Sequence, residues 1–288
     1  MNQELRKDAE QIIDVAIASV QPDAAVRRAL SNLVFSEHVY IVAIGKAGWQ
    51  MANAAVSYLQ ENGIRYEKGV VLTKYHHVMG QLPRMLCVEA GHPVPDENSF
   101  KGTKEVLSMV KDLTAEDMVL FLVSGGGSAL FEKPKISGEE LADITEQLLA
   151  SGADIVEMNT IRKRLSEVKG GRFALACMPA MVEAVVLSDI VGDPMDMIAS
   201  GPAYPDASTC EDAGKIAKKY KLRLSAAAEK CLADETPKEL HNVHTQIIGS
   251  VRQLCKAAYK ACKELGYEPR ILAEDVTAEA REVGWNLA

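Results

Sequence analysis

The sequence has no long hydrophobic run. No uninterrupted apolar stretch approaches the roughly 20 residues that a membrane-spanning helix needs. Residues 1–14, MNQELRKDAEQIID, carry too many charges for a secretory signal. We therefore expect a cytoplasmic protein that has no membrane partner.

Paired cysteines and an excess of basic residues are also missing. The six cysteines are scattered without CxxC spacing, so neither a zinc site nor a disulfide framework is indicated. The formal net charge is −8, which argues against a nucleic-acid partner because phosphate backbones are bound through concentrated Lys and Arg. A composition with 48% hydrophobic and 25% charged residues is typical of a globular enzyme.

Two common nucleotide-binding fingerprints are absent. No GxGxxG turn stands between a strand and a helix with an acidic residue about 20 positions later, which disfavours an ordinary dehydrogenase. No GxxxxGK[ST] motif occurs either, which disfavours a P-loop kinase.

A glycine loop is the most informative feature that is present. Residues 118–123, MVLFLV, form an apolar run that predicts a buried strand. The loop follows directly and consists of Ser124, Gly125, Gly126, Gly127 and Ser128. Glycines let a ligand approach the main chain, so backbone N–H groups and the serine hydroxyls could hold a phosphate or another oxyanion. The alternative is a tight turn that binds nothing.

Two other predicted strands end in polar loops. The strand at 38–44 is followed by Gly45 and Lys46, and the strand at 181–187 by a segment that contains Asp189 and Asp193. Strands alternate with helices along the chain, which predicts a Rossmann-like three-layer α/β/α domain with a mainly parallel sheet. In such sheets ligands bind outside the carboxyl ends of the strands, so we expect the loops to meet in one crevice.

A polar helical segment at 152–172 supplies further candidates. Asn159, Arg162 and Lys163 project away from its apolar face, and Lys169 opens a Lys-Gly-Gly turn that could be a second anion site. For the basic residues a solvated surface face is an equal alternative.

The chain is expected to contain one domain and the beginning of another. Residues 233–242 are polar and include a proline, which is typical of a boundary. We place a Rossmann-like domain at 1–235 and the incomplete start of a second α/β domain at 240–288. The second contains strand-like stretches at 245–249 and 270–273 around a helix.

Five ordered motifs resemble one known family. They are VAIGKA at 42–47, AGHPVPD at 90–96, VSGGGSAL at 123–130, NTIRKRLSEVKGG at 159–171 and LSDIVGDPMDMIASGPAYPD at 187–206. Together they resemble the glycerate 2-kinases, which have a DUF4147 amino-terminal domain and a MOFRL carboxy-terminal domain. Family members run well past residue 288, and their GGRNQE-like MOFRL motif has no match here.

The resemblance implies ATP-dependent phosphorylation of D-glycerate, with Mg²⁺, in a site between two α/β domains. It implies a catalytic role for Lys46. Arg164 stands where the family often has His, and Ala203 follows the SGP motif where Thr is usual. Ser200 and Gly201 belong to that motif and are expected to contact substrate or nucleotide.

These residues suit phosphoryl transfer, which needs positioning and positive charge. Lys46 would stabilise either the γ-phosphoryl group or the glycerate carboxylate, and Arg162 and Lys169 would hold anionic groups. Asp189 and Asp193 would be Mg²⁺ ligands, or one would be the base. The expected partners are D-glycerate and a nucleotide, with a homodimer as a possible assembly. The alternatives are a hydroxypyruvate reductase and an anion-binding module without catalysis.

Overall fold

A sheet of six parallel strands forms the centre of the fold. The computed structural model describes residues 3–188, 194–276 and 278–287. The strands lie in the order β3-β2-β1-β4-β5-β6, with every neighbouring pair parallel. The strands are β1 (His38–Ile44), β2 (Lys68–Lys74), β3 (Met85–Ala90), β4 (Asp117–Val123), β5 (Met181–Leu187) and β6 (Val243–Gly249). The predicted parallel α/β sheet is confirmed.

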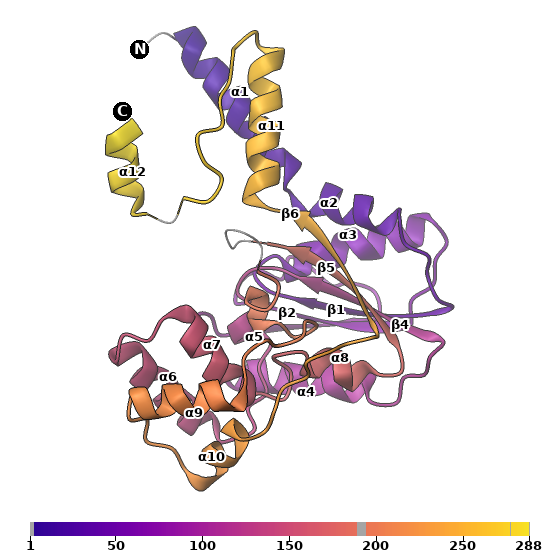
Figure 1. The fold of residues 1–288 in the computed structure, drawn as a ribbon. Helices are drawn as coiled ribbons and strands as arrows, with labels where there is room; N and C mark the ends of the chain where they lie inside the picture. Colours follow the sequence, from indigo (N-terminus) through magenta and orange to yellow (C-terminus); the bar gives the residue numbers. More distant parts are fainter. Residues whose placement is uncertain (1–2, 189–193, 277, 288) are drawn as a thin grey trace.

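Helices cover both faces of the sheet. Val42 and Ile44 of β1 point into a core shared with α4 and α8, whereas Ile41 and Ala43 point into a core shared with α2 and α3 (Figure 1). All seven residues of β4 are buried, as expected for a strand covered on both faces. The predicted three-layer arrangement is therefore confirmed.

The helices have the following bounds. They are α1 (Gln3–Ser19), α2 (Pro22–Leu30), α3 (Gly48–Glu61), α4 (Glu97–Val110), α5 (Gly127–Leu130), α6 (Gly138–Ala150), α7 (Ile155–Arg164), α8 (Arg172–Cys177), η1 (Ile198–Ser200), α9 (Cys210–Lys219), α10 (Ala226–Leu232), α11 (Val251–Glu264) and α12 (Ala280–Leu287).

The order in which strands join the sheet reverses at β1 and β4. Strands β2 and β3 add on one side of β1, and β4, β5 and β6 add on the other. Strands β1 and β4 are neighbours in the sheet, and their register pairs Ile44 with Val123, the last residue of each. Their following loops therefore begin at the same level, side by side. This is the topological switch point of a doubly wound sheet, where such folds bind ligands.

Four helices form a separate apolar cluster beside the sheet. Helices α6, α7, α9 and α10 pack around Leu141, Ile161 and Leu165, and Figure 1 shows them grouped at one end of the molecule. This cluster supports α7, which carries several of the candidate site residues.

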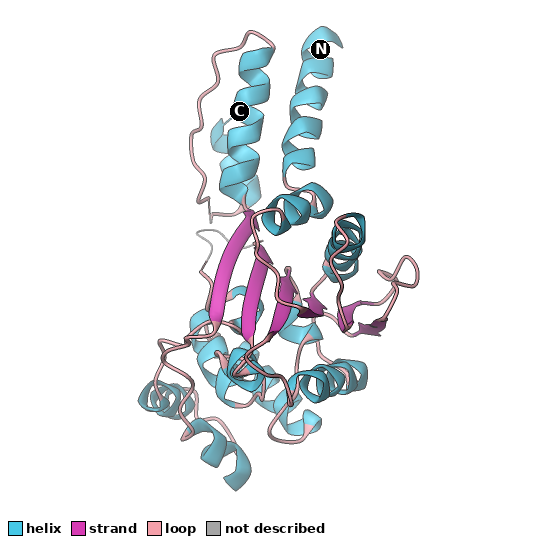
Figure 2. Ribbon diagram, turned by 90° about the vertical axis from the view of Figure 1, so that its right-hand side faces the viewer, coloured by secondary structure: helices cyan, strands magenta, loops and turns pink. Residues whose placement is uncertain are grey.

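The carboxy-terminal part of the described chain departs from expectation in two ways. Strand β6, expected to belong to a second domain, pairs with β5 at the edge of this sheet. Residues 270–273, expected to be strand-like, are irregular. Helices α1 and α11 pack side by side and extend away from the sheet (Figure 2). The division at 235–240 stays a proposal. None of the described helices is long and apolar enough to cross a membrane.

Candidate active site

The loops after β1 and β4 are joined by hydrogen bonds. The backbone N–H of Lys46 donates to the carbonyl of Gly125 at 2.8 Å. The Ser124 hydroxyl donates to the carbonyl of Ile44 and accepts from the N–H of Ala47, both at 3.1 Å. Ser124 is buried, so its hydroxyl holds the two loops together instead of facing solvent.

The side chain of Lys46 leaves this joined pair of loops toward solvent. Lys46 is exposed, and no carboxylate among the described residues pairs with its ammonium group. Gly126 has φ +88°, and a Cβ there would lie 3.0 Å from the His92 ring and 3.1 Å from Cγ of Lys46. Lys46, His92 and the glycine loop thus converge. A charge that no described carboxylate pairs at this position is available to an anionic ligand.

A turn of unusual conformation packs against the other side of the glycine loop. Ala199, Ser200 and Gly201 have φ values of +52°, +62° and +63°. Left-handed conformations are unfavourable for Ala and Ser, and such residues concentrate at functional sites. A Cβ on Gly127 would lie only 2.6 Å from Cβ of Ala199, so the close packing requires glycine at this position.

Three side chains selected from the sequence meet between these segments. Oγ of Ser128 lies 2.9 Å from Oγ of Ser200, and Ser200 donates to Oδ1 of Asn159 at 3.0 Å. Asn159 and Ser200 are buried. The glycine loop, the 199–201 turn and α7 are therefore connected by one chain of polar side chains.

The Lys-Gly-Gly turn is bonded to the same region. The N–H of Gly170 donates to the carbonyl of Ser200 at 3.0 Å, and that of Gly171 to the carbonyl of Gly201 at 2.7 Å. These amides are consequently occupied by the protein's own carbonyls. They hold the strained turn in place.

Arg162 contacts the last residue of the glycine loop, and Lys169 contacts the turn that follows it. Arg162 donates from Nη2 to the carbonyl of Ser128 at 3.4 Å, and burial lowers the pKa of its guanidinium. Lys169 is fully buried, and its ammonium lies 2.9 Å from Oε2 of Glu132. Burial lowers the pKa of Lys169, while the charge of Glu132 opposes that shift.

The neighbouring basic residues are not a solvated face. Lys163 is buried and contacts Asp206 at 3.1 Å and Asp196 at 3.2 Å. Burial raises the pKa of Asp206, but the charge of Lys163 and the hydrogen bonds to the carboxylate together outweigh burial. The pKa of Asp206 is therefore lowered. The solvated alternative for Lys163 is therefore wrong.

Arg164 has a structural role. It is fully buried and donates to Oε1 of Glu235 and to the carbonyl of Ser208, both at 2.8 Å. A guanidinium with these partners pins α7 to two loops and is not placed for acid–base chemistry.

Asp189 and Asp193 lie outside the described residues. Within the described ranges, no group of three or more His, Cys, Asp or Glu side chains could hold a metal ion.

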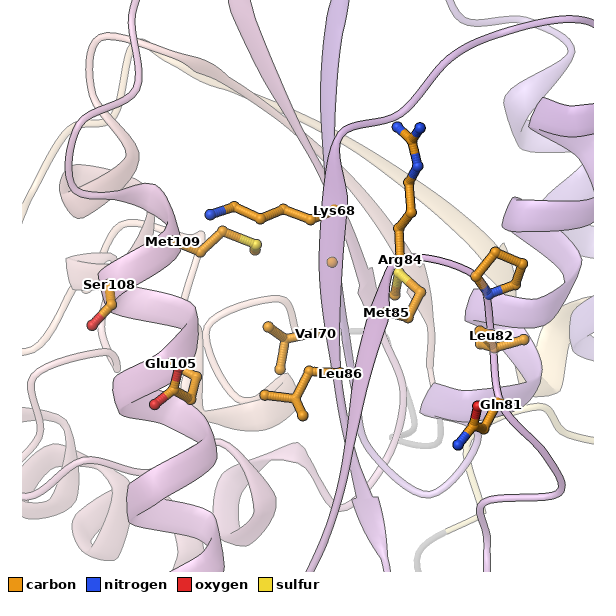
Figure 3. A pocket seen from close by; sticks show the side chains of 12 residues that line it. Lys68, Val70, Gln81, Leu82, Arg84, Met85, Leu86, Glu105, Ser108 and Met109 are labelled. Carbon is orange, nitrogen blue, oxygen red and sulfur yellow. The ribbon is translucent and has the colours of Figure 1, made fainter.

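A large cavity lies at the opposite end of the strands and is not part of this site. Its volume is about 750 Å³, and it is bordered by the residues that begin β2 and β3. Figure 3 shows Glu105, Ser108 and Met109 of α4 across from Val70 and Leu86 of the sheet. The carboxyl-end loops contribute nothing to its lining.

Known proteins resemble the chain over almost its whole length. Residues 8–233 match the family model described as a domain of unknown function, DUF4147. A D-glycerate 2-kinase of Thermotoga maritima is 49% identical over 97% of this chain and 67% of its own length. The chain belongs to the glycerate 2-kinase family. A glycerate 2-kinase of Pyrococcus horikoshii is 35% identical over 98% of this chain and 68% of its own length.

The structural comparison agrees with the family. A crystal structure of glycerate kinase from T. maritima matches with a TM-score of 0.94 and 48% identity, covering 99% of this chain and 68% of that one. A relative from Agrobacterium vitis, provisionally named a hydroxypyruvate reductase, is 36% identical over 97% of this chain and 64% of its own length. The chain thus spans about two thirds of the length of these members of the family.

Several residues at the site were not selected from the sequence. His92 lies in the AGHPVPD motif, so its position after β3 was a usable signal. Asp196 lies in the motif at 187–206, so it had a similar signal, whereas Glu132 had none, because its partner Lys169 is more than 30 positions away. Only the folded chain brings these charges together.

Proposed function

We propose that this chain phosphorylates D-glycerate at its 2-hydroxyl with ATP as the donor. The observation that carries the proposal is the convergence of the exposed Lys46 side chain with the glycine loop at the β1–β4 switch point. The name of the 49% identical relative, D-glycerate 2-kinase, supports this choice of substrate.

The protein's own residues would act mainly by positioning and charge. The main-chain N–H groups of Gly125, Gly126 and Gly127 would bind phosphate oxygens, because amides in such loops attract anions. Lys46 would stabilise the negative charge of the transferring group or of the glycerate carboxylate. The Ser128, Ser200 and Asn159 chain would fix the shape of the loop.

Magnesium remains part of the proposal on chemical grounds. Mg²⁺ usually binds one or two carboxylates together with phosphate oxygens and water, and it would neutralise charge on the nucleotide. Asp189 and Asp193 would supply the carboxylates, and one of them could instead take the hydroxyl proton. Neither lies within the described residues, so no step is assigned to the metal.

Hydroxypyruvate reduction is the second candidate. The strand order 3-2-1-4-5-6 is that of dinucleotide-binding domains, and the A. vitis relative carries a reductase name. The absence of the GxGxxG turn and of its acidic partner argues against it. A chain that only binds anions is the third candidate.

Parallel assays separate the three candidates. One measures ADP release from ATP with D-glycerate, and the other measures NADH oxidation with hydroxypyruvate. ADP release that depends on D-glycerate supports the kinase. NADH oxidation supports the reductase, and binding of ATP without either turnover supports the binding module.

We also propose a cytoplasmic location, a homodimer, and a MOFRL-like identity for the residues from 240 onward. Sedimentation equilibrium would test the homodimer: a single species at the 31.2 kDa monomer mass would contradict it.

A further inference from the structure

A buried ion pair lies beside the helical turn that follows the glycine loop. Glu132 and Lys169 are both fully buried, and Nζ of Lys169 is 2.9 Å from Oε2 of Glu132. The same ammonium donates to the carbonyl of Phe131 at 3.0 Å. Buried ion pairs are often no more stabilising than apolar residues of similar volume, so stability alone does not explain this one.

Arg162 is the third member of this interior charge cluster, which consists of Glu132, Arg162 and Lys169. Its Nη2 donates to the carbonyl of Ser128 at 3.4 Å, whereas its Nε is buried without a hydrogen-bond partner in the described part of the chain. The charges of the three groups influence one another: Glu132 raises the pKa of Arg162, and Arg162 lowers that of Lys169.

The cluster has one positive charge more than the described residues balance. It contains two cations and one carboxylate. The neighbouring charges are already paired, because Lys133 contacts Glu167 at the surface and Lys163 lies between Asp196 and Asp206. Lys169 is the cation in contact with Glu132, so the unbalanced charge belongs to Arg162.

We propose that Lys169 is a positioning residue that pairs with Glu132 and thereby leaves the charge of Arg162 for an oxyanion on the glycine loop. The oxyanion is a phosphate oxygen or a carboxylate oxygen, and this choice rests on the proposed kinase function. Arg162 and Lys169 hold the carbonyls of Ser128 and Phe131, so the cluster also fixes the helical turn that follows the loop.

A thermodynamic cycle tests the proposal. The double substitution Glu132→Gln with Lys169→Met removes both charges of the pair, so no unpaired charge is left buried. Lys169→Met alone instead leaves Glu132 to pair with Arg162. Both variants are made in the wild-type protein and in an Arg162→Met background. Isothermal titration calorimetry measures the Kd of ATP, of inorganic phosphate and of D-glycerate separately, and a melting curve measures Tm. The control, Lys133→Met with Glu167→Gln, removes the neighbouring surface pair.

The expected result is a rise of about tenfold or more in one oxyanion Kd for Lys169→Met alone, because Glu132 then cancels the charge of Arg162. The double variant keeps that charge, so its Kd should stay within about twofold of the wild-type value, with a much smaller Tm change than for Glu132→Gln alone. In the Arg162→Met background Lys169→Met should change that Kd less than about twofold, because the charge that Glu132 would cancel is already absent. The surface control should leave every Kd unchanged.

The three ligands identify the source of the oxyanion. Weaker binding of ATP and inorganic phosphate indicates that the oxyanion is a phosphate oxygen. Weaker binding of D-glycerate alone indicates that it is the substrate carboxylate. An equal rise in Kd for Lys169→Met in both backgrounds, no rise in either, a similar rise for the double variant, or no binding by the wild type would overturn the proposal. Because the titrations need no turnover, a wild type that binds but does not release ADP would contradict the kinase function and not this inference.

Discussion

The hydroxyl of Ser128 lies 2.9 Å from the hydroxyl of Ser200, and this contact joins two loops that are 72 residues apart in sequence. One is the glycine loop after β4, and the other is a turn whose residues have positive φ. The unfavourable turn conformation is held by Asn159, Gly170 and Gly171. We infer that the shape of the anion site depends on this docking.

Replacing Lys46 by Ala should abolish most turnover. Removing a group that stabilises developing charge typically lowers kcat by about 10²- to 10³-fold. Lys46 is exposed and holds no structural ion pair among the described residues, so Tm should stay close to that of the wild type. The matched control is Lys68→Ala at the opposite end of the sheet, which should retain full kcat. A Lys46→Ala variant with near-normal kcat would remove this residue from the mechanism.

Ser200 offers a pair of variants that separates bonding from backbone strain. Both Ser200→Ala and Ser200→Gly remove the hydroxyl that bonds Asn159 and Ser128. Only glycine relieves the cost of φ +62°, so Ser200→Gly should be the more stable by about 1 kcal/mol in urea unfolding. Equal unfolding free energies would show that the turn is unstrained.

The close packing of Gly127 on Ala199 predicts a rescue experiment. Gly127→Ala should lower the free energy of unfolding by about 1–3 kcal/mol, because its Cβ would overlap that of Ala199. Adding Ala199→Gly removes the overlapping atom and suits φ +52° at that position. Chemical denaturation should show most of the loss recovered in the double variant. If the unfolding free energies lost in the two single variants simply add in the double variant, the contact between residues 127 and 199 is ruled out.

The lowered pKa of Glu235 predicts that its carboxylate stabilises the fold against acid. Burial raises its pKa, but hydrogen bonds from Cys210, Lys238 and Thr236 outweigh burial, and its pKa falls from 4.5 to about 2. The folded-state value is the lower one, so the stabilisation is present above pH 4.5 and is lost as the pH falls toward 2. Glu235→Gln should therefore flatten the pH dependence of unfolding in that window. An unchanged slope in Glu235→Gln would show that this carboxylate contributes nothing there.

Sequence patterns predicted most of the sheet but not the buried charges. The apolar runs and the polar loops after them were sufficient to place β1, β4 and β5, because hydrophobic periodicity is a local property. The burial of Lys163 and Lys169 depends on Asp206 and Glu132, which lie 43 and 37 positions away. The position of β6 in the same sheet depends on pairing with β5, which no local pattern encodes.

The most direct test of the central claim is phosphoryl transfer to D-glycerate by the purified chain. ³¹P NMR of a reaction with ATP and D-glycerate distinguishes phosphate on the 2-hydroxyl from phosphate on the 3-hydroxyl. The proposed kinase function predicts accumulation of 2-phosphoglycerate and ADP with the wild type and near-loss of both products with Lys46→Ala. ATP that stays intact in the presence of D-glycerate, or phosphate that appears only on the 3-hydroxyl, would contradict the proposed function.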